Sequence, residues 1–204
     1  VYHATRLEFL KLTGANVFEV FDGINKSFSH MQSACAASEF LIRTSAFGGE
    51  YPQALSMITA LLRELANVDE SEALLVLSAF FWNALSPLGL IPDLLSCERC
   101  GRSFSEKNSL PGKLLINESS FLCHNCAEEF RQMGLSTSAM LPFDEKVLTC
   151  LRSITKLSYS EALPLLKSAS LRPEIIAIIE SLAESAAEGP LQSLRVFGET
   201  FYGT

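Results

Sequence analysis

Two Cys-x-x-Cys pairs constrain the fold of this chain more than any other feature of its sequence. The first pair is Cys97 and Cys100, the second is Cys123 and Cys126, and 22 residues (101–122) lie between the pairs. Two residues between cysteines let a tight turn aim both sulfurs at one point, so two such turns supply four ligands to one metal ion. The spacing therefore predicts a Zn²⁺ site with Cys97, Cys100, Cys123 and Cys126 as its ligands.

Four thiolates fill a tetrahedral shell, whereas a catalytic zinc keeps one position open for water or substrate. We therefore expect one structural zinc ion that stabilises a ribbon over residues 96–130. Between the pairs, residues 113–122 predict a strand of a small β-hairpin, entered through Pro111-Gly112. His124 lies inside the second pair and could replace one of the cysteines as a ligand. We favour the alternative, that it is a loop histidine that points outward. A redox dithiol or a fortuitous spacing is the alternative to zinc.

Composition supports a metal rather than a set of disulfides. The chain has 204 residues, of which 48% are hydrophobic, so a core large enough to fold without cross-links is expected. Charged residues interrupt the apolar stretch near Val1, which argues against a signal peptide. Because the first residue is Val1 rather than Met, we expect the chain to begin inside a longer product. Two prolines break the apolar stretch 73–95, so it lacks the uninterrupted helix of about 20 apolar residues that a membrane span needs. We expect a soluble, cytoplasmic protein.

Most of the remaining sequence has helical periodicity. Segment 25–47 predicts a helix whose core side carries Phe28, Met31, Ala34, Cys35, Ser38, Leu41 and Ile42. Segment 70–85 is apolar nearly all round, which predicts a central buried helix and favours core packing over base stacking for Phe80-Phe81-Trp82. Further helices are predicted at 52–67, 127–133, 142–156, 160–167, 173–189 and 191–202, with Cys150 on an apolar side. Residues 1–20 fit a terminal strand or the start of a helix.

Charge and motifs limit the possible functions. The chain has 16 Lys+Arg against 23 Asp+Glu, a net charge of −7, which argues against a surface devoted to nucleic-acid phosphates. The clustered cations of the ribbon are the candidates for DNA contacts, with ordinary surface charges as the alternative: Arg99, Arg102, Lys107 and Lys113. The sequence has no Gly-rich phosphate loop, HExxH or Gly-x-Ser-x-Gly, so we expect a protein that is not an enzyme.

The segment before the first cysteine pair carries a family resemblance. Gly89-Leu90-Ile91-Pro92-Asp93-Leu94 fits Gly-x-x-Pro-x-Leu and leads directly into Cys97-x-x-Cys100-Gly101. This arrangement resembles the C-terminal part of the RecO family, the bacterial recombination mediators. Segment 189–195, Gly-Pro-Leu-Gln-Ser-Leu-Arg, resembles that family's closing Pro-Leu-Lys-Ser-Arg segment, although Gln192 and Leu194 replace its lysine and arginine. The resemblance covers nearly the whole chain from about residue 20.

The resemblance implies a mainly α fold, in which a helical bundle carries a four-cysteine zinc ribbon and an N-terminal OB-fold is largely absent from this chain. Residues 1–20 would then be the last strand of that OB-fold. The helical domain would comprise 21–95 and 131–204, on either side of the ribbon at 96–130. Family members bind single-stranded and double-stranded DNA, anneal complementary strands, and work with RecR to load RecA. The resemblance thus implies a role in DNA repair near the bacterial nucleoid.

A further implied partner is the tail of single-stranded-DNA-binding protein, which is acidic and ends in an apolar residue. Its receptor needs an apolar pocket with a cation at the rim. Candidates for that cation are Arg63, Arg131, Lys156 and Arg195. RecR binding is expected through the missing OB-fold. Two alternatives remain: a general zinc-ribbon module that binds nucleic acid, or an accessory domain of a larger DNA-processing enzyme.

Overall fold

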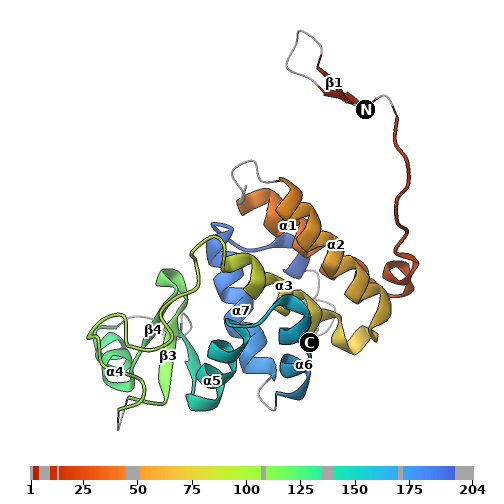
Figure 1. Cartoon of the computed structure of the whole chain (residues 1–204). Helices are drawn as coiled ribbons and strands as arrows, with labels where there is room; N and C mark the ends of the chain where they lie inside the picture. Colours follow the sequence, from red (N-terminus) through yellow and green to blue (C-terminus); the bar gives the residue numbers. More distant parts are fainter. Residues whose placement is uncertain are drawn as a thin grey trace.

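The computed structural model describes residues 2–4, 10–12, 14–44, 51–106, 109–134, 140–169 and 172–195, and it confirms a mainly α fold with a small antiparallel sheet. The helices are α1 (Phe28–Thr44), α2 (Tyr51–Asn67), α3 (Ala73–Leu85), α4 (His124–Gln132), α5 (Glu145–Ile154), α6 (Tyr159–Ser168) and α7 (Arg172–Ala186). The strands are β1 (Tyr2–Ala4), β2 (Leu10–Leu12), β3 (Gly112–Leu115), β4 (Ser120–Leu122) and β5 (Met140–Phe143). Figure 1 shows the helices gathered around α3, with α4, β3 and β4 at one side.

Helix α3 is the centre of the bundle, as its sequence predicts. Eleven of its 13 residues are buried, because α1, α2, α6 and α7 all pack against it. Phe80 and Phe81 contact the ring of Phe40 on α1, with ring centroids 6.5 and 5.2 Å apart. The indole Nε1 of Trp82 donates to Thr155 Oγ1 at 3.2 Å. The three consecutive aromatic residues are therefore core residues, and base stacking is excluded for them.

Helix α1 forms where the sequence predicts it, but its buried face is not the predicted one. Phe28, Met31 and Ile42 are exposed, and Cys35 is exposed with them, so the prediction that Cys35 belongs to the core is wrong. The buried residues are mostly small or polar: Ser29, His30, Gln32, Ser33, Ala36, Ala37 and Phe40. Small side chains leave room for the backbone of α1 beside α3, and Phe40 is the one large apolar residue on the buried face. The face of α1 that is buried is therefore the one whose side chains fit beside α3, and not the most hydrophobic one.

A three-stranded antiparallel sheet, in the order β4-β3-β5, replaces the single strand predicted for 113–122. A 3₁₀ turn and Ser119, with a positive φ of 50°, reverse the chain between β3 and β4. The predicted helix start at Pro142 is wrong, since Pro142 lies in β5. Proline is tolerated there because β5 is an edge strand of this sheet. Helix α5 begins after Asp144, whose carboxylate caps it by accepting from the Val147 N–H at 2.9 Å.

The two ends of the described chain are tied differently. Strands β1 and β2 pair with each other as a short antiparallel ladder, so this end holds two strands where one was predicted. Residues 14–20 are extended, and Glu19 accepts two hydrogen bonds from the Arg63 guanidinium on α2. Whether residues 1–20 belong to an OB-fold stays a prediction. Of the predicted helix at 191–202, residues 192–195 are helical, Leu191 precedes them without regular structure, and residues 196–202 lie outside the described residues.

The closing segment, residues 187–195, is held against α1 by two charged side chains. Arg43 donates to the carbonyl oxygens of Pro190 and Ala187 at 2.6 and 2.7 Å. Glu39 accepts the backbone N–H groups of Gln192 and Ser193, both at 2.9 Å. Burial tends to raise the pKa of Glu39, but these N–H donors outweigh it, and the pKa of Glu39 is lowered. The segment that carries the second family-like motif is thus docked on α1.

None of the helices in the described part of the chain is both long and apolar enough to cross a membrane.

The orientation of α1 can be tested with two substitutions on that one helix. Phe40→Ala removes a fully buried ring, and we expect it to lower the free energy of unfolding by about 3–5 kcal/mol. Ile42→Ala, at a position 74% exposed, should change it by no more than about 0.5 kcal/mol. Urea unfolding followed by circular dichroism measures both. The inverse result, with Ile42→Ala the costlier change, would place the predicted face in the core after all.

Candidate metal centre

The structure brings the four predicted cysteines together at one point. The Sγ atoms of Cys97, Cys100, Cys123 and Cys126 all lie within 4.8 Å of one another, and those of Cys100 and Cys123 are 3.8 Å apart. Four sulfurs bound tetrahedrally at about 2.3 Å from a zinc ion would be about 3.8 Å apart. The cluster therefore has the size of a tetrahedral thiolate site, slightly expanded. Within the described residues, no second cluster of this kind is found.

The first cysteine pair sits in a tight turn. The Gly101 N–H donates to the Cys97 carbonyl at 2.8 Å, and the Cys97 N–H donates to the Arg102 carbonyl at 2.9 Å. Gly101 has a φ of +70°, the left-handed conformation that glycine adopts without a steric penalty. This turn aims both sulfurs of the pair to the same side, as the sequence predicts.

The second pair is carried by the start of α4. Cys123 is the extended N-cap residue of that helix, and Cys126 lies in its first turn. The Glu98 N–H donates to the Phe121 carbonyl at 3.0 Å, which ties the first turn to β4. His124 is exposed and is not part of the cluster. The two turns are thus fixed to each other by backbone contacts as well as by proximity of the sulfurs.

The electrostatics of the cluster favour a bound cation. Burial opposes the Cys97 thiolate, but backbone N–H groups that face its sulfur outweigh burial and lower the pKa of Cys97 to about 7. Burial raises the pKa of Cys123, and burial together with the neighbouring thiols raises that of Cys126. One thiolate thus opposes ionisation of the others when no counter-charge is present. A divalent ion that prefers sulfur removes this conflict, so the donor set fits a metal ion.

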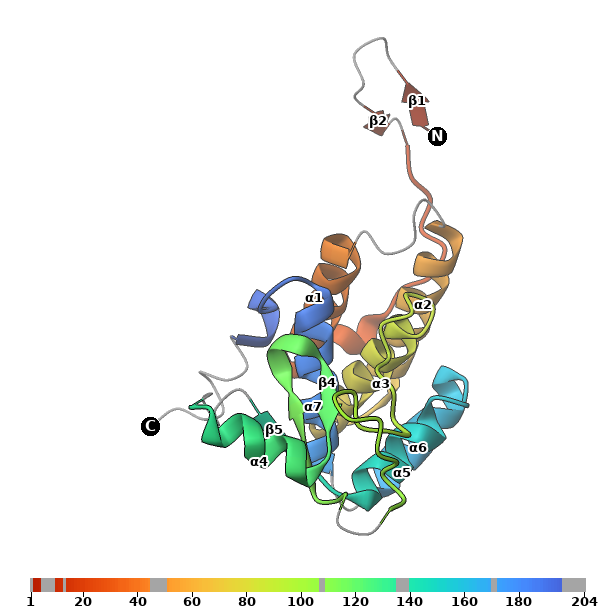
Figure 2. The ribbon, with the colours of Figure 1, turned by 90° about the vertical axis from the view of Figure 1, so that its left-hand side faces the viewer.

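The Gly-x-x-Pro-x-Leu segment positions the first turn against the bundle. Gly89 takes a φ of +67° just after α3, and Asp93 accepts the Leu95 N–H and the Ser96 hydroxyl, which lowers the pKa of Asp93. Arg152 on α5 donates from Nε and Nη2 to the Leu94 carbonyl at 2.9 and 2.5 Å. Figure 2 shows this side of the molecule, where the sheet lies against α7. Arg152 is a positioning residue that the sequence analysis did not find.

The predicted DNA-contacting cations occupy different environments. Arg99 lies over the Phe130 ring, with Cζ 4.5 Å from the centroid, and pairs with Glu129 at 3.7 Å. Arg102 is half-buried in the first turn, and Lys113 is half-buried on β3. Lys107 lies outside the described residues. The structure thus places Arg99 and Arg102 together and puts Lys113 on the sheet, and no contact with DNA is tested.

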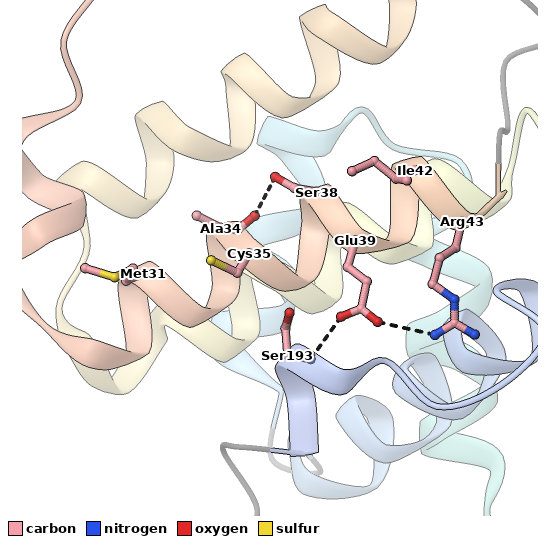
Figure 3. A pocket seen from close by; sticks show the side chains of 8 residues that line it. All are labelled: Met31, Ala34, Cys35, Ser38, Glu39, Ile42, Arg43 and Ser193. Carbon is pink, nitrogen blue, oxygen red and sulfur yellow. Dashed lines mark hydrogen bonds and ion pairs between the residues drawn. The ribbon is translucent and has the colours of Figure 1, made fainter.

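Among the grooves of the described bundle outside the ribbon, two are candidates for a partner site. The first has a volume of about 470 Å³ and is lined by Met31, Ala34, Cys35, Ser38, Glu39, Ile42, Arg43 and Ser193. Figure 3 shows that this α1 groove runs along the outward face of α1, with Ser193 of the closing segment at one side. The second groove, of about 500 Å³, lies between α5, α6 and the start of α7. Of the four predicted rim cations, Arg63 and Arg131 are engaged in ion pairs, and Lys156 and Arg195 are exposed.

Comparison with known proteins agrees with the geometry. A family model described as the C terminal of recombination protein O matches residues 26–138, more than half of this chain. That range includes the helices α1 to α4 and all four clustered cysteines. The DNA repair protein RecO of Pelobacter propionicus is 26% identical over 144 residues, which are 71% of this chain and 54% of that protein. The chain thus spans about half the length of this relative. It belongs to the RecO family and matches that family's C-terminal part.

Proposed function

We propose that this chain is the zinc-binding helical part of a recombination mediator in DNA repair. Such a mediator binds single-stranded DNA and single-stranded-DNA-binding protein, anneals complementary strands, and works with RecR to load RecA. The observation that carries the proposal is the family match over residues 26–138. A role in DNA repair and recombination follows from family membership, and the described relative is a DNA repair protein. The partners and the individual steps are part of the proposal.

The metal in this proposal is one zinc ion, held by Cys97, Cys100, Cys123 and Cys126. Four cysteine sulfurs at tetrahedral spacing are typical of structural zinc, which fills its shell with protein ligands and holds a fold together. The ion would supply the positive charge that the cluster lacks and lock the turn at Gly101 to the start of α4. Its role is therefore to shape the ribbon, and this chain's own side chains carry the contacts with partners.

We expect purified chain to contain one zinc per molecule. Cys126→Ser removes a buried ligand, so bound zinc should fall by at least tenfold, while Cys35→Ser and Cys150→Ser should retain it. Elemental analysis gives the metal content, and circular dichroism shows whether the α1–α3 bundle is still folded. Full zinc content in a folded Cys126→Ser chain would contradict the ligand set.

The proposed DNA contacts are the ribbon cations Arg99, Arg102, Lys107 and Lys113. Arg99 is partly engaged by Phe130 and Glu129, so it is less free to bind a phosphate than an unpaired arginine is. Residues 97–131 carry equal numbers of basic and acidic side chains, which favours a weak contact that depends on salt. The ribbon would then assist DNA binding, and an OB-fold in the complete protein would supply the main groove.

The α1 groove is the proposed receptor for the tail of single-stranded-DNA-binding protein. Its floor offers apolar side chains such as Met31 and Ile42, which suit the apolar residue at the end of that tail. Glu39 is neutralised by Arg43 and by two backbone N–H groups. Arg195 is exposed two residues beyond Ser193, and we propose it as the rim cation for the acidic peptide. The α1 residues that line the groove lie within the range that the family model matches, whereas Ser193 lies outside it.

Peptide binding tests this placement. A peptide of that tail should bind saturably and slow alkylation of Cys35, because Cys35 lines the groove. Ile42→Ser and Arg195→Ala should each weaken binding at least fivefold. Leu55→Ser, at an apolar position 66% exposed on α2 and outside the groove, should leave the affinity unchanged. Equal binding by Ile42→Ser, or binding that Lys146→Ala in the second groove abolishes, would overturn the placement.

A second candidate function is an accessory zinc domain in a larger DNA-processing enzyme. The observation in its favour is that the chain spans about half the length of the relative it matches. For the mediator, by contrast, we propose that RecR binds through the OB-fold that is largely absent from this chain, and that the site of action is the bacterial nucleoid. An annealing assay of the complete protein separates the two candidates. Annealing of complementary strands in the absence of nucleotide cofactors would favour the mediator.

A further inference from the structure

The four cysteines of the cluster differ sharply in how far each residue is exposed. Cys97, Cys123 and Cys126 are 1, 0 and 5% exposed, whereas Cys100 is exposed. Cys100 is therefore the point at which a dissolved reagent reaches the cluster. Its Sγ also lies 3.8 Å from the Sγ of Cys123, within contact range of two sulfurs. An exposed cysteine with its sulfur beside that of a buried cysteine is the arrangement that a disulfide-forming oxidation needs.

We propose that Cys100 is an oxidation site for hydroperoxides, and that its oxidation closes a Cys100–Cys123 disulfide that opens the ribbon. This inference rests on the proposed zinc site, because the released ion is the consequence that makes it a switch. The disulfide removes two of four ligands, one from each turn. Two remaining sulfurs, at Cys97 and Cys126, do not fill a tetrahedral shell, so the affinity for the ion falls.

The chemistry balances with the hydroperoxide as the oxidant. The Cys100 thiolate attacks one oxygen of the O–O bond, so that an S–O bond forms, the O–O bond breaks, and hydroxide or alkoxide leaves. The Cys123 thiolate then attacks the Cys100 sulfur, so that the S–S bond forms and the S–O bond breaks with loss of hydroxide. The two sulfurs together lose two electrons, and the peroxide gains them.

The other two cysteines of the chain serve as internal comparisons. Cys35 is exposed on α1, outside the cluster, and Cys150 is half-buried on α5. An oxidised Cys35 has no cluster cysteine beside it, whereas an oxidised Cys100 lies next to the Cys123 sulfur and can form a disulfide with it. The proposal therefore depends on Cys100 lying beside Cys123, because exposure of a thiol alone would make Cys35 equivalent to Cys100.

Opening the ribbon would leave the bundle in place. The turn at Cys100 is joined to the sheet through the Glu98–Phe121 hydrogen bond and to α5 through the Leu94–Arg152 contact. Helix α3 lies outside these contacts and keeps its own core of aromatic side chains. Oxidation by peroxide would thus change the conformation of the ribbon, and with it the positions of the ribbon cations, while the helices of the bundle remain folded.

The test uses the zinc-loaded chain with Cys35→Ser and Cys150→Ser, in which the cluster holds the remaining thiols. After titration with hydrogen peroxide, a chromogenic chelator measures released zinc and peptide mass mapping identifies the disulfide. We expect one zinc released per Cys100–Cys123 disulfide, and recovery of binding after reduction. A Cys97–Cys100 disulfide, or oxidation with the zinc retained, would overturn the inference. A chain that holds no zinc before peroxide contradicts the proposed function, and the inference with it.

Histidine variants provide a second readout. Cys100→His replaces the exposed thiolate by another zinc ligand that peroxide attacks far more slowly, so zinc release should slow at least tenfold. Cys126→His is the matched control, because it also leaves a set of three cysteines and one histidine but keeps Cys100 and Cys123. Its release rate should stay within about twofold of the parent chain. Equal rates of zinc release from Cys100→His and the parent would show that another sulfur is attacked first.

Discussion

Burial of helix α3 is the constraint on which the rest of this structure depends. A helix that is apolar on every side has to be covered on every side, and α1, α2, α6 and α7 provide that cover. The requirement for close approach explains why α1 presents Ala36 and Ala37 to the core with only one large residue, Phe40. The larger apolar residues of α1 then remain on the outside. The α1 groove is in this sense a consequence of how α3 is packed.

The ribbon depends on a different interaction, the convergence of four thiols. Backbone turns bring the sulfurs together, but one thiolate raises the cost of the next, so the sulfurs need a shared cation. The ribbon is then fastened to the bundle by Arg152, which binds the Leu94 carbonyl three residues before the first ligand. The molecule therefore combines a hydrophobic bundle and a ribbon built around a four-cysteine cluster, and a few contacts join them.

The parts of this structure that the sequence predicts are those fixed by local chemistry. Cysteine spacing predicts the cluster, and a fully apolar segment predicts the buried α3. The face of α1 was predicted wrongly because hydrophobic periodicity ignores the room available beside α3. Strand β5 was missed because its pairing with β3 joins residues far apart in the chain. Arg152 carries no local signal, since its role depends on a carbonyl 58 residues away.

The central claim is that a bound metal holds the ribbon while α3 holds the bundle. Amide hydrogen exchange, measured before and after removal of zinc by a chelator, tests this claim most directly. The account predicts faster exchange at Glu98, Gly101 and His124, whose N–H groups are bonded within the ribbon, and unchanged protection inside α3. Unchanged exchange in the ribbon, or an equal loss of protection in α3, would contradict it.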